Sequence, residues 1–114
     1  MRRIEDLLQD GHKVWFYLKD EDTESLFVEE LNRLGAKYLN GATITSENCS
    51  PIMAVHADLR VAHLMIMIWN ASFMPSFADH YVGDVTKILK VDYAKYIAGE
   101  PDFICQRSEF TPIA

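Results

Sequence analysis

The chain begins with apolar residues at helical spacing and continues with a run at strand spacing. Ile4, Leu7 and Leu8 share one helical face, and a glycine follows that can end a helix because it adopts the left-handed conformation. The next segment, "KVWFYL", is β-branched and aromatic, which is typical of a strand. We therefore expect a helix over residues 2–11 and a strand over residues 13–18.

The segment "DEDTESLFVEELNRLG" (20–35) predicts the clearest helix of the chain. Asp22 or Thr23 can cap its start by accepting hydrogen bonds from free backbone N–H groups, and Gly35 ends it. The apolar stripe consists of Phe27, Leu31 and Leu34, joined by Leu26.

Shorter extended segments and turns follow. Asn40-Gly41 is a strong turn signal within residues 36–45, and residues 52–70 predict a β-hairpin that turns near 57–60. Residues 71–84 contain proline and glycine and predict an irregular segment.

The last third predicts one more strand and a short helix. Residues 85–91 are compatible with either a strand or a helix, and we favour a strand that runs through Val91. Asp92 then caps a short helix over 93–99, and the tail from 100 onwards is mostly loop. The order α-β-α-β-β-β-β-α predicts a single α+β domain over 1–114, with a mostly antiparallel sheet of about four to five strands and helices packed on it.

The hairpin segment "RVAHLMIMIWN" is apolar on both faces of the predicted strand. Alternation places Ala62, Leu64, Ile66 and Ile68 towards the 20–35 helix. The opposite face carries Val61, His63, Met65, Met67 and Trp69, joined by Trp15 and Tyr17 of the first strand. We interpret this second face as a core layer covered by the N-terminal or C-terminal helix. The alternatives are an exposed interface for a partner or a second copy of the chain, and a small-ligand pocket.

The irregular segment 71–84 carries four large apolar side chains, an unusual number for a surface loop. They are Phe73, Met74, Phe77 and Tyr81. Either the segment folds back on the sheet or it presents these side chains to a partner.

Composition narrows the classes of function. The net charge is −6, which argues against direct binding of nucleic acid or of anionic lipid. Neither a signal peptide nor an apolar run of membrane-spanning length is present, so we expect a cytoplasmic protein without a membrane partner. The chain has only two cysteines, Cys49 and Cys105, too few for a disulfide framework.

Catalytic and metal signatures are lacking. The spacings of His12, His56, His63 and His80 match no zinc pattern, and the scattered glycines form no phosphate-binding loop. Cys49 beside a histidine would be a minor enzymatic alternative. We therefore expect no enzymatic activity, no metal and no cofactor.

The strongest charge feature is the acidic run "KDEDTESLFVEE". A solvated helix face with a favourable helix dipole is the simplest interpretation. The functional interpretation is an acidic surface that imitates phosphate spacing and occupies a basic groove. The two interpretations are compatible, because a solvated face is also an accessible one.

Residues 13–69 resemble small, largely uncharacterised α+β proteins encoded by phages and other bacterial mobile elements. The resemblance rests on a G-x-x-W/Y-x-x-G turn after an amphipathic helix, here "GAKYLNG" with Gly35, Tyr38 and Gly41. It implies the setting of inhibitors of host defence such as anti-CRISPR proteins, which are often acidic and non-enzymatic. Some proteins of that setting instead sequester nucleotide signals. Tyr38 is interpreted as structural, pinning the segment after the helix to the sheet.

The sequence therefore predicts a non-enzymatic protein that occludes a host protein, plausibly a nucleic-acid-guided nuclease, in the bacterial host cell. The predicted partner-binding residues are Asp20, Asp22, Glu24, Glu29 and Glu30, with Phe73 and Phe77. The alternative is a small-ligand or nucleotide-signal binder that uses Trp15, Tyr17, His63, Met67 and Trp69.

Overall fold

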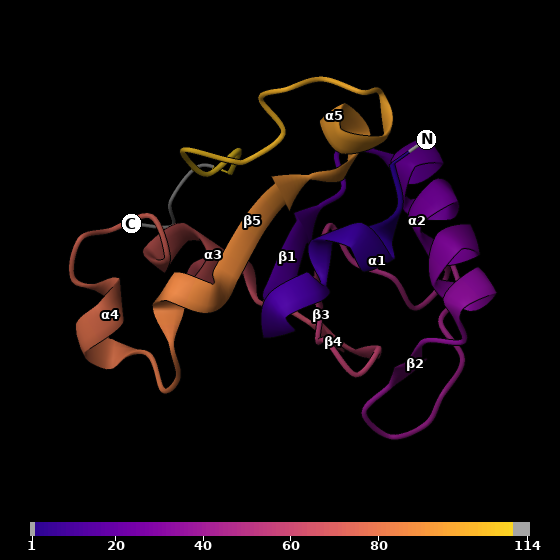
Figure 1. Ribbon diagram of the computed structural model, residues 1–114, viewed down its shortest axis with the longest axis horizontal. Coiled ribbons are helices and arrows are strands. Elements are labelled where there is room, and N and C mark those ends of the chain that lie inside the picture. The colour runs from indigo at the N-terminus through magenta and orange to yellow at the C-terminus, as the bar shows by residue number, and fades with distance from the viewer. Residues whose placement is uncertain (1, 111–114) are drawn as a thin grey trace.

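The computed structural model describes residues 2–110 and places a five-stranded sheet at the centre of the molecule. The strands are β1 (Lys13–Tyr17), β2 (Lys37–Tyr38), β3 (Ile52–Val55), β4 (Arg60–His63) and β5 (Ile88–Asp92), in the order β2-β4-β3-β1-β5. The α-helices are α1 (Ile4–Leu7), α2 (Glu21–Leu34), α3 (Ile66–Ala71), α4 (Phe77–His80) and α5 (Tyr93–Ile97). Short 3-10 helices span Gln9–Gly11 and Val85–Lys87. Figure 1 shows α1, α2 and α5 gathered at one side of the sheet and α3 and α4 at the other.

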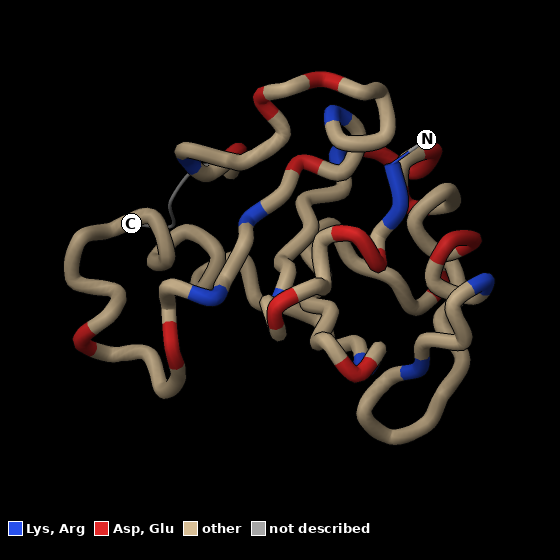
Figure 2. The backbone as a smooth tube through the Cα atoms, viewed as in Figure 1, with Lys and Arg blue, Asp and Glu red and all other residues tan. Residues whose placement is uncertain are grey.

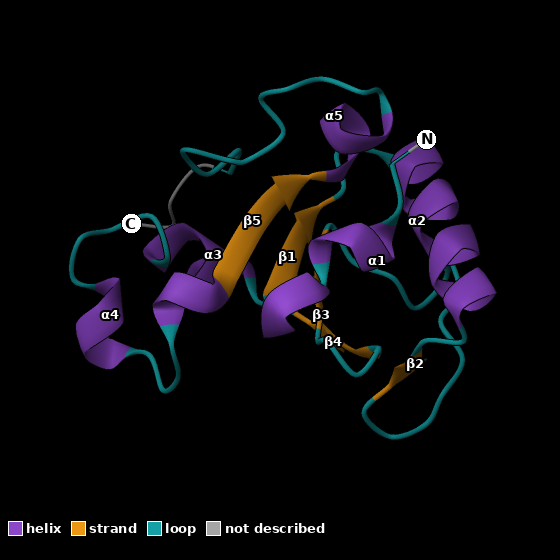
Figure 3. Ribbon diagram, in the orientation of Figure 1, coloured by secondary structure: helices purple, strands orange, loops and turns teal. Residues whose placement is uncertain are grey.

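The predicted α+β class is confirmed, but the sheet is mixed rather than mostly antiparallel. Strand β3 runs antiparallel to both β1 and β4. The two outer strands are instead parallel to their neighbours, β5 to β1 and β2 to β4. The predicted order also lacks α3 and α4, which lie between β4 and β5 (Figure 3). Strand direction depends on how the connections cross the sheet, which hydrophobic alternation does not encode.

The N-cap of helix α2 lies two or three residues earlier than predicted. Asp20, not Asp22 or Thr23, is the N-cap, because its Oδ1 accepts hydrogen bonds from the Thr23 backbone N–H at 2.8 Å and hydroxyl at 2.6 Å. Gly35 ends the helix as predicted, with φ of 75°. Phe27 and Leu31 of the predicted stripe are buried, but Leu26 is half exposed and does not belong to it.

The prediction that the second strand of the hairpin continues beyond His63 is wrong. The chain turns at 57–60 as predicted, but β4 ends at His63 and the next residues form α3. The backbone N–H groups of Ile68 and Trp69 both donate to the Met65 carbonyl at 3.0 Å. A short run of methionine and isoleucine is compatible with a helix turn as well as with a strand, so periodicity alone does not separate them.

The predicted faces of this hairpin are inverted. The register pairs Val55 with Val61 and Met53 with His63, which places Val61 and His63 on the α2 side of the sheet. The prediction had placed both residues on the opposite side, beside Trp15. Side chains alternate with a period of two, so one residue of shift in the turn exchanges the two faces.

Each face of the sheet carries its own apolar cluster. Val14, Phe16, Phe27 and Leu31 belong to the cluster under α2. The second cluster contains Trp15, Ile52, Ala54 and Trp69, with Tyr17, Phe73, Phe77, Tyr81 and Phe110 packed against it. The interpretation of the second face as a core layer is confirmed for Trp15, Tyr17 and Trp69, but Val61 and His63 lie on the other face and Met65 and Met67 are exposed. The cover of this second face is the segment with α3 and α4 plus the tail, not a terminal helix as expected.

Residues 85–91, which the sequence leaves open between strand and helix, form a short helical turn followed by a strand. Residues 85–87 are 3-10 helical, and the strand then runs through Val91 as expected. The Asp92 side chain caps α5 by accepting from the Lys95 backbone N–H at 3.3 Å. The tail runs beside β5, because Asp92 N–H donates to the Phe103 carbonyl and Cys105 N–H to the Lys90 carbonyl, both at 2.8 Å. The last four residues of the predicted loop tail lie outside the described residues.

Within residues 2–110, none of the helices has the length and apolar character needed to cross a membrane.

Trp69 is expected to dominate the stability of the second cluster, because its side chain is fully buried. Replacing a large buried aromatic residue by alanine costs about 3–5 kcal/mol of unfolding free energy, and we expect Trp69→Ala to fall in that range. Trp69→Phe should cost less, since the indole Nε1 has no hydrogen-bond partner among residues 2–110. Urea unfolding measures both. A cost for Trp69→Ala no larger than that of exposed Met67→Ala would contradict this assignment of the core.

Candidate functional site

The acidic run lies on the surface at the start of α2. Asp20, Glu21, Asp22 and Glu29 are exposed, and Glu24 is partly buried. Glu47, from the loop before β3, joins Glu21 and Glu24 around a shallow cavity of about 270 Å³. We call these residues the acidic surface: Asp20, Glu21, Asp22, Glu24, Glu29 and Glu47. None of them forms an ion pair with another residue of the part of the chain that the structure describes.

The carboxylates of the acidic surface influence one another. Partial burial raises the pKa of Glu24, and the negative charges of Glu21 and Asp20 raise it further. Hydrogen bonds from the Thr23 side chain and backbone lower the pKa of Asp20, so this carboxylate stays ionised while it caps the helix. The start of helix α2 therefore carries a concentrated negative charge.

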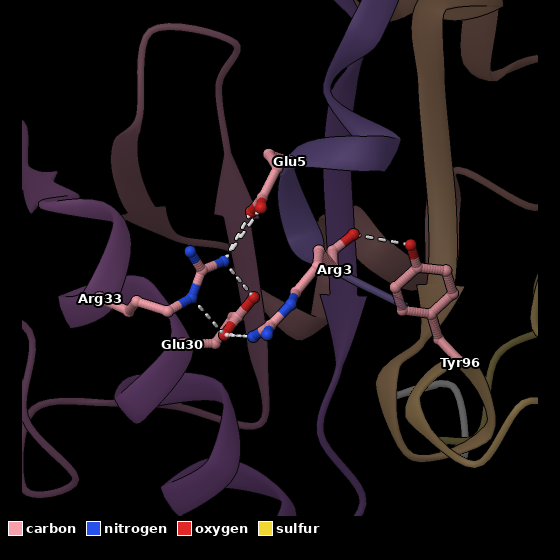
Figure 4. A network of polar contacts seen from close by, with 5 residues as sticks. All are labelled: Arg3, Glu5, Glu30, Arg33 and Tyr96. Carbon is pink, nitrogen blue, oxygen red and sulfur yellow. Dashed lines mark hydrogen bonds and ion pairs between the residues drawn. The ribbon is translucent and has the colours of Figure 1, made fainter. Parts of the chain in front are cut away.

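The other end of α2 carries paired charges, as Figure 4 shows. Arg33 donates to Glu30 through Nε at 2.9 Å and through Nη2 at 2.6 Å, and Nη2 also contacts Glu5 Oε2 at 2.8 Å. Arg3 reaches the same Glu30 carboxylate at 3.3 Å. The Tyr96 hydroxyl donates to the Arg3 backbone carbonyl at 2.7 Å, which connects the network to α5.

Glu30 is therefore bound within the molecule. The hydrogen bond from Arg33 is the main cause of its lowered pKa, and only 13% of its side chain is exposed. Of the predicted partner-binding acids, Asp20, Asp22, Glu24 and Glu29 belong to the acidic surface. Glu30 instead holds α2 against the N-terminal segment. Figure 2 shows the acidic and basic positions along the chain.

The predicted apolar contacts, Phe73 and Phe77, lie on the other side of the sheet. Phe73 packs against Trp69 with ring centroids 5.3 Å apart, and Phe77 packs against Trp15 at 6.1 Å. Both side chains are partly buried. Because they lie on the opposite side of the sheet, the structure does not bring them together with the acidic surface. The large exposed apolar side chains near them are Met65, Ile66, Met67, Ile68 and Met74. Sequence reasoning missed most of these because it placed them in a strand.

The alternative ligand-binding residues do not form one open surface. Trp15 and Trp69 are buried, and Tyr17 lies 6.5 Å from the Trp69 ring. Met67 is exposed on α3, and His63 lies across the sheet from all of them.

Tyr38 has the structural surroundings expected from the turn motif. Its hydroxyl donates to the Asn48 carbonyl at 2.6 Å, and the His63 Nε2 lies 2.5 Å from the same oxygen. These contacts fasten the loop between β2 and β3 to the sheet.

The candidate reactive groups show no activation. Burial raises the pKa of the Cys49 thiol to about 11 and that of Cys105 to about 12, so both stay protonated at neutral pH. Within residues 2–110, His, Cys, Asp and Glu do not gather into a group of three or more with metal-binding geometry.

Comparisons of the chain with protein-family models, with curated proteins and with solved structures find no match.

The contrast between Glu30 and its neighbour Glu29 can be measured. The pKa of Glu30 is lowered in the fold from its ordinary 4.5, so its stabilising contribution is present above that pH and is lost as pH falls through the folded pKa. We expect Glu30→Gln to lower the urea midpoint at pH 7 and to change it much less at pH 3.

Glu29→Gln serves as the matched control, since Glu29 is exposed and forms no ion pair within residues 2–110. It should leave the midpoint nearly unchanged at both pH values. Equal effects of the two substitutions at pH 7 would contradict the division of α2 into a paired and an unpaired end.

Proposed function

We propose that this protein is a non-enzymatic binding protein whose acidic surface occupies a basic groove of a larger host protein. The observation that supports this proposal is that Asp20, Glu21, Asp22, Glu24, Glu29 and Glu47 form no ion pair within residues 2–110. At the other end of α2, Glu30 is instead paired with Arg33 and Arg3. A concentrated negative surface without internal counter-charges is complementary to a groove built to hold phosphates.

The mean density of these charges along the helix axis supports imitation of a nucleic-acid strand, although four of them lie at the start of α2 and only Glu29 lies further along. Asp20, Glu21, Asp22, Glu24 and Glu29 lie within ten consecutive residues of α2 and its cap. At about 1.5 Å of rise per residue, that is one charge per ~3 Å of axis. Each strand of B-DNA carries one phosphate per ~3.4 Å, so the two linear charge densities are close.

The proposed partner is a nucleic-acid-guided nuclease of a bacterial host. The resemblance of the "GAKYLNG" turn and its preceding helix to proteins of phages and mobile elements motivates this choice. Such a nuclease holds its guide and target in a positively charged channel, which is the kind of surface that a row of carboxylates fits. The inhibitor would act in the cytoplasm by excluding nucleic acid, with no bond made or broken.

A panel of purified bacterial RNA-guided nucleases tests this function. We expect the protein to bind at least one of them, to inhibit its DNA cleavage, and to be displaced by excess target DNA. The combined variant Glu21→Gln, Asp22→Asn, Glu24→Gln and Glu29→Gln should bind at least tenfold more weakly, because four charges facing the groove are removed. Asp20 is left unchanged, since it caps the helix.

The matched control removes four charges elsewhere: Asp10→Asn, Asp79→Asn, Glu100→Gln and Glu109→Gln, all of them exposed. It has the same net charge as the first variant and should bind like the unmodified protein. Equal losses of nuclease binding in both variants would show that binding depends on net charge alone and not on the acidic surface. The absence of binding to every nuclease in the panel would overturn the choice of partner.

A further inference from the structure

A cavity of about 250 Å³ lies beside β5, on the side of the sheet away from α2. Side chains from residues 72–78 line it on one side, and Val85 and Ile88 on the other. The lining contains a single charged residue, Lys90. Most of the lining residues are apolar, but polar atoms make up more of the cavity wall than apolar atoms do, and the cavity is partly open to solvent. It has one cation in its wall and shares no residue with the acidic surface.

Lys90 is held in a fixed position. It lies in β5, paired with Trp15 of β1, and its backbone carbonyl accepts from the Cys105 N–H on the other side. The Nζ atom donates to the Ser72 carbonyl at 3.0 Å and lies 4.1 Å from the centroid of the Phe73 ring. Little conformational freedom is left for a ligand to remove.

The ammonium group of Lys90 has donors that remain free for solvent or a ligand. It can donate three hydrogen bonds, and among residues 2–110 only the Ser72 carbonyl accepts one. No carboxylate forms an ion pair with it in the same part of the chain. Partial burial lowers the pKa of Lys90, which is the expected response of a desolvated amine without a counter-ion.

We propose that this cavity binds a small monocarboxylate with a short apolar chain. The carboxylate would accept hydrogen bonds from Nζ of Lys90, and the chain would lie among the side chains of residues 74–78, Val85 and Ile88. A small anion would give Lys90 a counter-charge, and the lining holds no second cation for a phosphate or a dicarboxylate. This site is independent of the proposed function of the acidic surface.

Hexanoate is a suitable probe, with 1-hexanol as its uncharged counterpart. Titration of isotope-labelled protein, followed by methyl and amide NMR, should shift the signals of Val85, Ile88 and Met74 with hexanoate at millimolar concentration. Hexanol should bind at least tenfold more weakly. Equal affinities would show unspecific apolar binding, and no shifts at these positions would mean no site; either result overturns the proposal.

Two variants test separately the charge of Lys90 and the volume of the cavity. Lys90→Met keeps the length of the side chain and should weaken hexanoate binding at least tenfold, whereas Lys87→Met, at an exposed position, should not. Ala78→Phe fills the cavity from an exposed position on α4 and should also abolish binding, without touching the core. Unchanged hexanoate binding in a folded Ala78→Phe protein would overturn the location of the site even if Lys90→Met fails to fold.

Discussion

The burial of β1 on both faces is the constraint on which the rest of the structure depends. Phe16 lies under α2 and α5, with the Phe27 ring 5.0 Å and the Tyr93 ring 5.6 Å away. Its neighbour Trp15 points to the opposite face, against Phe77 and Tyr81. A strand that is apolar on both sides needs a cover on both sides, since each fully buried aromatic side chain contributes about 2–3 kcal/mol of burial free energy. Helix α2 supplies one cover, and the segment from residue 64 to residue 81 supplies the other.

This requirement explains why a small chain uses so much of its length on irregular apolar structure. Helices α3 and α4 are short, and neither would be stable alone in water. They persist because Trp69, Phe73 and Phe77 insert into the second cluster. The segment that appeared available for partners is thus largely committed to the core. Helix α2 has the opposite character, because it needs only one face for packing and leaves the other for charge.

Local signals were predictable from the sequence, and long-range ones were not. Gly35, the Asn40-Gly41 turn and the Asp92 cap depend on the conformation of a few adjacent residues, and they occur as expected. The face of His63 depends on a register set by a single turn residue, Leu59, which adopts φ of 65°. The direction of β5 depends on its crossover connection. Neither is written in the alternation of apolar and polar residues.

The candidate site shows the same division. The acidic run was visible in the sequence, because consecutive carboxylates on an amphipathic helix must face solvent. The pairing of Glu30 with Arg33 is local, at i,i+3 spacing, and the sequence could have indicated it. The contacts of Arg3 with Glu30 and of Glu5 with Arg33 could not be foreseen, since Arg3 and Glu5 come from a segment distant in sequence. The cavity beside Lys90 was also beyond sequence reasoning, because it is formed between residues 72–78 and β5 only when the chain folds back. Distinguishing Glu29 from Glu30 required three-dimensional contacts.

The strip of tail along β5 has a consequence for how this molecule meets others. Exposed strand edges invite neighbouring chains to add on, which is how sheets grow into aggregates. Residues 103–105 already occupy that position through two backbone hydrogen bonds. The tail therefore blocks the addition of another strand at that edge, because the backbone of β5 between residues 90 and 92 already forms hydrogen bonds within the same chain.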